Sequence, residues 1–228
     1  MENRKILKAV LIIVMLSLIL VVAYWARNFI ILNKIVKMQE KISSSDNYSY
    51  IIEFYDNNKE DITTTVQCYY KDGKMLKTVK LEDDSSRIVW HDENTKEGIT
   101  LNSNELTATI DVYGSNFNFF DCDMEMQMLT PARYTNILED SLTVLIGYDK
   151  IDGKECYFVQ PLMGVVSSAA YYEKNDGPIV KYTMGNYIEG GKKYYGSKIE
   201  YKNLKSNEVT DNDVLKPDLT GYTLIDNR

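Results

Sequence analysis

The sequence predicts a mostly β protein of the α+β class, with one strongly curved, mostly antiparallel sheet of about eleven strands that follows a single transmembrane helix. Three observations lead to this prediction. An uncharged apolar run of 18 residues lies close to the N-terminus. From Asn47 onward, short runs rich in β-branched and aromatic residues alternate with turn residues about every ten positions. Consecutive short connections between such runs are typical of an antiparallel meander.

The transmembrane helix is predicted from the run between Ala9 and Ala26, which at helical rise is about long enough to cross a hydrocarbon core of roughly 30 Å. Tyr24 and Trp25 lie at its end, where amphipathic rings favour the headgroup layer. The run is longer than an ordinary signal-peptide core, and no small-x-small cleavage site closes it. We therefore expect residues 1–27 to be a retained signal-anchor that crosses the cell membrane once, with the C-terminal domain extracytoplasmic. A cleaved signal peptide and an inverted topology are the alternatives.

Residues 28–46 are predicted to continue this helix as an amphipathic segment that leads into the domain. Apolar residues fall at helical spacing, and asparagine, lysine and glutamate take the other side. The apolar stripe consists of Ile31, Leu32, Ile35, Val36, Met38 and Ile42. We expect the stripe to dock on the domain core, whereas the alternative role is a lid or hinge at the membrane surface.

The domain itself is predicted to span residues 47–228. Its strands are expected near residues 48–55, 63–70, 74–82, 87–91, 98–101, 106–111, 143–148, 156–160, 169–174, 179–186 and 193–202. Asp72-Gly73 between two of these runs is a strong hairpin signal, because both positions tolerate positive φ.

One helix is expected inside the domain. Thr130-Pro131 is a typical helix start, with Thr as the cap and Pro in the first helical position. The buried face of this helix is expected to consist of Tyr134, Ile137, Leu138 and Leu142. Near the C-terminus, residues 210–213 are typical of a capping box that opens one short turn.

The charge of the chain argues against nucleic acid as a partner. The formal net charge is −7, and residues 41–228 carry 20 basic and 31 acidic side chains. Such an acidic domain repels phosphate backbones, and no basic cluster offsets this repulsion. The cysteines, Cys68, Cys122 and Cys156, are odd in number and lack metal-ligand spacing, so no metal or other cofactor is predicted. One disulfide with a spare thiol and three buried reduced thiols both stay open.

Both faces of the sheet are expected to carry apolar area. Tyrosine doublets occur at Tyr69-Tyr70, Tyr171-Tyr172 and Tyr194-Tyr195. Because neighbouring strand residues face opposite ways, each doublet places one ring on each side of the sheet. The helices, a ligand or another protein must therefore cover the second face.

The layout of the domain resembles the LolA-like fold, the half-barrel of lipoprotein carriers and their relatives. The resemblance is carried by the hairpin Tyr69–Lys74, the segment Asp152–Val159, and the ending Val209–Asp218 with Gly221-Tyr222. It implies a curved antiparallel half-barrel with helices on its concave side. The chain is also similar to the GerS-related germination lipoproteins of spore-forming bacteria, which implies a non-catalytic partner of a peptidoglycan amidase in sporulation and germination. It departs from them in lacking a lipidated Cys, which the anchor would replace.

Two stretches of the sequence contain residues that could have a chemical role. In the string Asp121–Met128, Cys122 and three methionines would share one face of a strand, which suits either Cu(I) or a flexible apolar strip. No His or second Cys supports copper, so the apolar strip is predicted. His91 is the only histidine and stands beside Asp92. Because no nucleophile-elbow motif is present, we expect a polar surface pair and no catalysis.

These observations predict a non-enzymatic binding module held at a membrane. The first hypothesis is a GerS-like protein that contacts an envelope protein such as a peptidoglycan amidase, through the open strand edges of an incomplete barrel. The second is a carrier-like protein that holds a lipid or a lipoprotein acyl chain between sheet and helices. The groove for this ligand is predicted to be lined by Trp90, Phe119, Met124, Met126 and Met128, chosen by size and placement.

Overall fold

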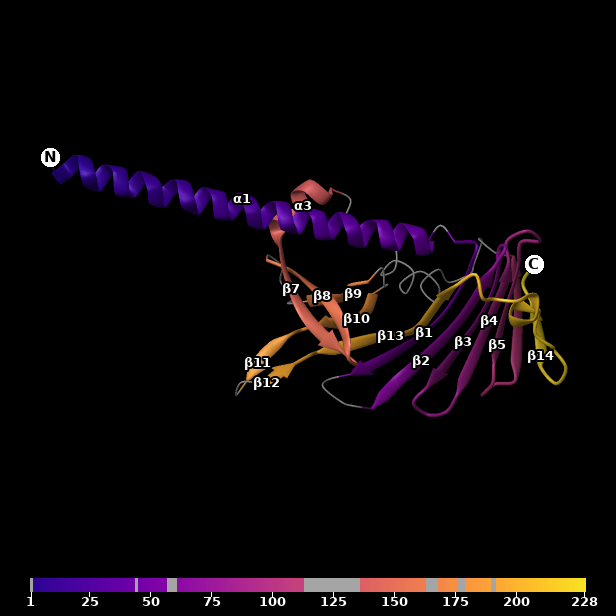
Figure 1. The fold of residues 1–228 in the computed structure, drawn as a ribbon. Coiled ribbons are helices and arrows are strands. Elements are labelled where there is room, and N and C mark those ends of the chain that lie inside the picture. The colour runs from indigo at the N-terminus through magenta and orange to yellow at the C-terminus, as the bar shows by residue number, and fades with distance from the viewer. Residues whose placement is uncertain are drawn as a thin grey trace.

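The computed structural model describes residues 2–43, 45–56, 61–112, 136–162, 168–175, 179–189 and 192–228. In these ranges the chain forms one long helix, an open sheet of 12 strands and a separate two-stranded sheet (Figure 1). The strand order of the large sheet is β14-β6-β5-β4-β3-β2-β1-β13-β10-β9-β8-β7. Its two end strands do not pair with each other, so the predicted mostly β half-barrel with an N-terminal apolar helix is confirmed.

The bounds of the elements are as follows. The helices are α1 (Glu2–Ser43), α3 (Ile137–Thr143) and the short 3-10 helix η2 (Asp211–Val214). The first meander consists of β1 (Asn47–Asp56), β2 (Ile62–Lys71), β3 (Lys74–Leu81), β4 (Ser86–Asp92), β5 (Glu97–Asn102) and β6 (Thr107–Val112). The remaining strands are β7 (Val144–Ile151), β8 (Lys154–Pro161), β9 (Ser168–Glu173), β10 (Ile179–Met184), β11 (Tyr187–Glu189), β12 (Lys192–Tyr194), β13 (Ser197–Ser206) and β14 (Thr223–Asp226).

The predicted hairpin at Asp72-Gly73 forms as the sequence indicates. Asp72 has φ of 50° and Gly73 has φ of 80°, and Lys71 pairs with Lys74 across the turn. Two central residues with positive φ make the kind of tight turn whose twist matches the flanking strands. Asp152 and Gly153 repeat this geometry between β7 and β8. Both turns therefore set the register of their hairpins.

Strand β13 joins the two halves of the sheet. It pairs antiparallel with β1 on one side and with β10 on the other, so two meanders distant in sequence become one continuous sheet. The order of the strands in the sequence does not disclose the pairing of β13 with β1, because the rest of the domain separates these two strands in the chain.

The C-terminal half of α1 fills the curved face of the sheet. Leu32 and Ile35 of α1 are fully buried and belong to one apolar cluster that also contains Val89 of β4 and Ile146 of β7. A single helix can contact both wings of the sheet only if the sheet curves around it, so α1 lies on the concave side. The predicted amphipathic stripe thus docks on the core, and α1 is continuous with the apolar N-terminal run.

The outer face carries two smaller apolar clusters, one on each wing. The first contains Trp90 of β4, and the second contains Cys156 and Tyr171. Tyr171 lies in the second outer cluster whereas Tyr172 lies in the cluster beneath α1, so this doublet places one ring on each face as predicted.

The C-terminal segment covers one of the outer clusters. Leu219 and Tyr222 pack against the cluster of Trp90, and β14 then pairs parallel with β6. The predicted capping box forms at η2, where the Thr210 backbone N–H donates to the Asp213 carboxylate at 2.8 Å. Strand β14 itself was not predicted, because a parallel edge strand leaves no hairpin signal in the sequence.

Three predicted elements, one helix and two strands, differ from the structure. The interior helix is described only from residue 137, and its Leu138 and Leu142, predicted as buried, are 54% and 60% exposed. Ile137 does pack partly against the core, and Tyr134 lies outside the described residues. The helix is short and lies beside α1, so the core contact is made mainly by α1.

The predicted strands 179–186 and 193–202 are each interrupted. Gly185 has φ of 70°, and a Cβ added there would lie 3.2 Å from the Gly196 Cα. This close approach of two backbones bends the hairpin, and the separate β11–β12 pair begins beyond the bend. A glycine at each position permits the bend.

Candidate functional site

A groove of about 1000 Å³ lies along the C-terminal half of α1. One wall is α1 between Ile30 and Lys41, and this length corresponds to about 16 Å of helix. The other wall is the end of β13 together with the residues that follow α1 and the β2–β3 turn. Its full lining is Ile30, Asn33, Lys34, Lys37, Met38, Lys41, Ser45, Asp46, Asn47, Asp72, Leu204, Lys205, Ser206 and Asn207. We call this space the α1 groove.

The amphipathic sequence of α1 gives the α1 groove its chemistry. Leu32 and Ile35 face the core, whereas Asn33, Lys34 and Lys37 lie on the side of the helix that lines the groove. Lys34 is half-buried and its Nζ donates to the Lys174 carbonyl oxygen at 2.9 Å. The helix therefore presents a basic wall beside its own apolar stripe.

Asn47 holds the opposite wall in place. Its Nδ2 donates to the Val209 carbonyl oxygen at 2.9 Å, and its Oδ1 accepts from the Val209 N–H at 2.9 Å. The Asn207 N–H donates to the Asn47 carbonyl oxygen at 2.9 Å, and Asn207 has φ of 62°. These bonds fix the chain just after β13, where Leu204 and Lys205 line the groove.

The charge of the α1 groove is opposite to that of the chain. Four lysines and two aspartates line it, whereas the whole chain has a formal net charge of −7. Lys205 is paired with Glu208 at 2.7 Å, and this hydrogen bond raises the pKa of the Lys205 ammonium. Lys37 and Lys41 are exposed at the groove. Together with Ile30, Met38 and Leu204, they suit a ligand with an anionic group and an apolar part.

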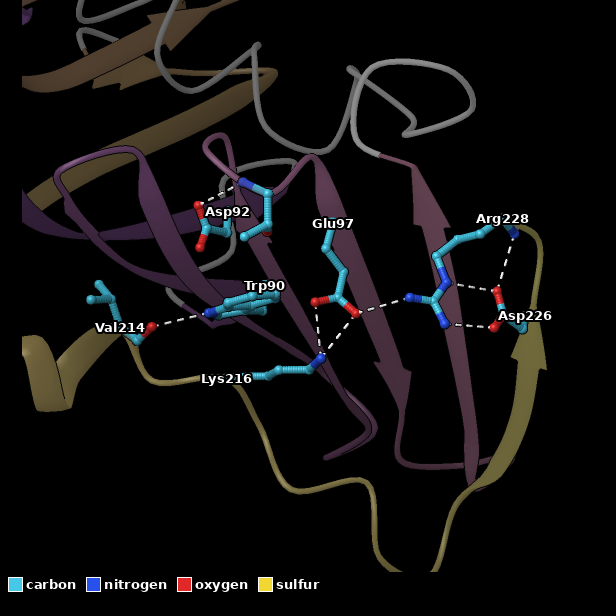
Figure 2. Close-up of polar contacts among 8 residues, drawn as sticks. Trp90, Asp92, Glu97, Val214, Lys216, Asp226 and Arg228 are labelled. Carbon is cyan, nitrogen blue, oxygen red and sulfur yellow. Dashed lines mark hydrogen bonds and ion pairs between the residues drawn. The ribbon is translucent and has the colours of Figure 1, made fainter.

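Among the five residues predicted to line an apolar groove, the structure describes only Trp90. Its ring is 4% exposed, and its Nε1 donates to the Val214 carbonyl oxygen at 3.0 Å (Figure 2). Its chain neighbour Val89 lies in the cluster beneath α1, so Trp90 lies on the opposite face of the sheet from the α1 groove. Phe119, Met124, Met126 and Met128 lie outside the described residues, as does Cys122.

Polar contacts close the C-terminal segment over Trp90. Lys216 Nζ lies 2.9 Å from both carboxylate oxygens of Glu97 and 5.8 Å from the centre of the Trp90 ring (Figure 2). Arg228 pairs with Asp226 at 2.7 Å and reaches Glu97 at 3.5 Å. The region around Trp90 is thus a packed and capped part of the structure.

His91 is buried, and the prediction of a polar surface pair was wrong. His91 is 4% exposed and Asp92 is 6% exposed. Burial lowers the pKa of the His91 imidazole to about 4, although the nearby Asp92 opposes this shift. Asp92 Oδ1 accepts from the Asn94 N–H at 2.8 Å and so shapes the following turn. The pair therefore has a structural role at the β4–β5 turn.

No group of three or more His, Cys, Asp or Glu side chains that could hold a metal ion occurs among the described residues. Cys68 and Cys156 are both buried. They lie in different clusters, Cys68 beneath α1 and Cys156 on the outer face, so no disulfide joins these two. The alternative of a Cys68–Cys156 bridge is therefore excluded.

The α1 groove was not predicted from the sequence. Its lysines appeared only as the polar side of an amphipathic helix, and its second wall comes from residues some 165 positions later. The signal that could have pointed to it is the concentration of lysine on this one segment of an otherwise acidic chain.

The helix α1 is the one candidate membrane span in the part of the chain that the structure describes. Its apolar stretch has a mean hydropathy of 3.0 and is 0% buried against the rest of the protein. Tyr24 is 40% exposed, and Trp25 Nε1 lies 3.5 Å from the Leu138 carbonyl oxygen. The domain thus makes its first contact with α1 at the end of the apolar run.

No protein-family model matches the chain, and no curated protein matches it. Among solved structures it is similar to MucB in complex with MucA(peri), with 9% identity, a TM-score of 0.44 and coverage of 85% of this chain and 61% of that chain. The chain thus spans about three fifths of the length of MucB.

The chain is similar to two further solved structures, and in both cases the match covers nearly the whole of the other protein. A LolA superfamily protein from Nitrosomonas europaea is 11% identical, with a TM-score of 0.31 and coverage of 81% of this chain and 97% of that chain. The lipoprotein LppX from Mycobacterium tuberculosis is 8% identical, with a TM-score of 0.44 and coverage of 79% and 96%. At these scores the chain is not assigned to a family, and its description as a half-barrel rests on its own sheet topology.

Proposed function

We propose that this protein is a membrane-tethered, extracytoplasmic binding module that holds an anionic amphiphile, such as an acidic lipid, in the α1 groove. The observation that carries this proposal is the basic wall of Lys34, Lys37 and Lys41 next to apolar side chains in a groove of about 1000 Å³. Ligand sites of several hundred cubic ångströms with a few placed polar groups are typical for small molecules.

Two further features support this proposal. Anionic groups are attracted to lysines that stand close to a membrane surface, by about 1 kcal/mol per lysine. Ile30 is 67% exposed at the groove, although it follows the apolar run by only four residues. An acyl chain that left the bilayer along α1 would meet Ile30 first and the lysines after it.

The test is lipid retention by the full chain. The protein is reconstituted in bilayers of phosphatidylcholine with a minority of phosphatidylglycerol, released, and weighed by native mass spectrometry. We expect phosphatidylglycerol to be retained preferentially, and the double variant Lys37→Glu with Lys41→Glu to retain about tenfold less or lower still, because two favourable charges become repulsive.

The matched control is the double variant Lys80→Glu with Lys150→Glu, which makes the same change of net charge at exposed positions outside the groove. This control is expected to retain phosphatidylglycerol as the parent does. Equal loss in both double variants, or no preference for phosphatidylglycerol in the parent, would contradict the proposal.

A second candidate function is contact with an envelope protein, and a GerS-like contact with a peptidoglycan amidase is its specific form. It is favoured by the position of β7 and β14 at the two ends of the sheet, where neither has a second strand neighbour among the described residues. A strand edge of this kind can accept a strand from a partner. Leu224 and Ile225 of β14 are 57% and 44% exposed.

Capture from solubilised envelopes of sporulating cells tests the second candidate. The full chain is used as bait beside a chain with Leu224→Lys and Ile225→Lys, whose charged edge disfavours strand addition. An amidase enriched by the parent and lost with the variant is the expected result. Absence of any amidase among the specific partners would count against this function.

A further inference from the structure

Residues 138–146 form a collar on α1 directly after its apolar run. Trp25 Nε1 lies 3.5 Å from the Leu138 carbonyl oxygen, and Asn28 Nδ2 donates to the carbonyl oxygens of Ser141 at 3.3 Å and Val144 at 3.1 Å. Arg27 Nη1 donates to a further carbonyl oxygen of the collar at 3.1 Å. These helix residues span about 5 Å along the axis of α1. The collar is therefore held at the level where the apolar run ends.

The collar carries exposed leucines at this level. Leu138 and Leu142 of α3 are one helical turn apart and share a face, and they are 54% and 60% exposed. Leu145 at the start of β7 is 42% exposed, and Leu162, the residue directly after β8, is 57% exposed. The Leu162 N–H donates to the Thr143 carbonyl oxygen at 2.7 Å, which places the end of β8 beside the collar. We call these four residues the collar leucines.

The view of the fold agrees with this placement. Figure 1 shows α3 and the adjoining end of β7 against the middle of α1, on the side of the domain toward which the N-terminal half of α1 projects. If that half crosses a bilayer, the collar faces the headgroup layer. Leucine side chains that are exposed at that depth would be transferred from water to the boundary between the headgroups and the acyl chains.

Basic and aromatic side chains surround the collar. The ring of Tyr148, a residue that is 59% exposed, lies close to two cations. The Arg27 guanidinium carbon is 5.1 Å from the centre of this ring, and Lys174 Nζ is 4.6 Å from it. Long cationic side chains and tyrosine rings favour the headgroup layer, where the stem is apolar and the tip is wet. The acidic residues of α3, Glu139 and Asp140, lie at its capping end with Asn136.

We propose that the collar leucines form a second, shallow contact with the lipid bilayer, in addition to the membrane-spanning part of α1. This contact fixes the rotation and tilt of the domain, because a single helix can tilt and rotate in the bilayer and carries the domain with it. It also sets the position of the α1 groove, whose first residue, Ile30, follows Asn28 by two positions. The proposal does not depend on what the α1 groove binds.

The test uses tryptophan as a depth probe in the full chain. The variant Leu142→Trp is reconstituted in phosphatidylcholine bilayers that contain lipids brominated on their acyl chains, which quench nearby tryptophan. We expect quenching well beyond that of the parent, in which Trp25 gives the membrane-level signal and Trp90 is buried. Leu138→Trp provides a second reporter on the same face if the first variant folds poorly.

The matched control is Leu215→Trp. Leu215 is 59% exposed, close to the 60% of Leu142, but it follows η2 in the segment that leads to β14, the strand at the opposite end of the sheet from β7. This variant is expected to show no quenching beyond the parent. Equal quenching at Leu142 and Leu215, or none at both Leu138 and Leu142 in folded protein, would overturn the proposal.

Discussion

Burial decides the chemistry of single residues in this protein, and His91 shows this most directly. The sequence places His91 beside an aspartate at the end of a strand, which is typical of a polar surface pair. In the structure the side chain is enclosed, so the neutral imidazole is favoured. A histidine with a lowered pKa binds its proton more weakly in the folded state than in the unfolded chain.

This difference predicts a pH dependence of stability. Between pH 6.5 and about pH 4 the unfolded state binds more protons at His91 than the folded state, so the free energy of unfolding falls as the pH falls through this window. The contribution is present in full above pH 6.5 and amounts to at most about 3 kcal/mol. Denaturant titrations of the parent and of His91→Asn over this range measure it.

The difference between the parent and His91→Asn isolates the contribution of His91, because the carboxylates titrate in the same way in both proteins and their contribution cancels. We expect the curve of the free energy of unfolding against pH to be flatter for His91→Asn. Parallel curves for the parent and the variant would mean that His91 has the same pKa in the folded and unfolded states.

At the scale of the element, α1 has two functions in one uninterrupted helix. The apolar run that begins at Ala9 is exposed, whereas the C-terminal half of α1 is amphipathic and completes the domain core. A sheet of this curvature cannot cover its own concave face, so the helix supplies the missing apolar layer. The apolar run of α1 and the domain are therefore mechanically continuous.

Substitutions in α1 should separate these functions. Leu32→Ala, at a fully buried position, is expected to lower the free energy of unfolding by about 2–5 kcal/mol, because it leaves a cavity in the core. Ile30→Ala, at a position that is 67% exposed, is expected to change it by about 0.5 kcal/mol or less. Denaturant unfolding of the full chain in detergent, followed by near-ultraviolet circular dichroism, measures both. Equal losses for the two variants would contradict the role assigned to the stripe.

At the scale of the whole molecule, charge and position act together. The chain is acidic overall, yet the α1 groove is lined by four lysines and two aspartates and lies just beyond the collar. An acidic surface repels anions from most of the protein, so an anionic ligand is concentrated where the local charge is reversed. The groove begins at Ile30, two residues after the last collar contact at Asn28, so under the proposed function a ligand from the bilayer would reach the basic wall directly.

This arrangement predicts a salt dependence of ligand retention. Raising sodium chloride to about 1 M shortens the Debye length to about 3 Å, so retention of phosphatidylglycerol by the parent chain is expected to fall toward that of phosphatidylcholine. Native mass spectrometry over a salt series measures the ratio of the two lipids. A ratio that does not change with salt would indicate that the apolar side chains alone select the ligand.

Local patterns made much of the fold predictable. Asp72-Gly73 requires positive φ at two positions, and this requirement is met in the same way in an isolated hairpin and in the protein. The stripe of Leu32 and Ile35 has a helical period wherever it occurs, so its burial could be predicted without knowing its partner. By contrast, Leu138 and Leu142 have the spacing of a buried face but lie exposed. Spacing alone does not disclose whether an apolar face packs on the core of its own domain.

The sequence by itself therefore determined the apolar helix, the strand meanders and the tight turns, since each depends on residues close together in the chain. Tertiary structure alone decided that β13 joins β1 to β10, that His91 is enclosed, and that lysines of α1 meet the end of β13 in one groove. These features depend on contacts between residues far apart in sequence. Their free energy comes from burial and charge in three dimensions, which no local pattern encodes.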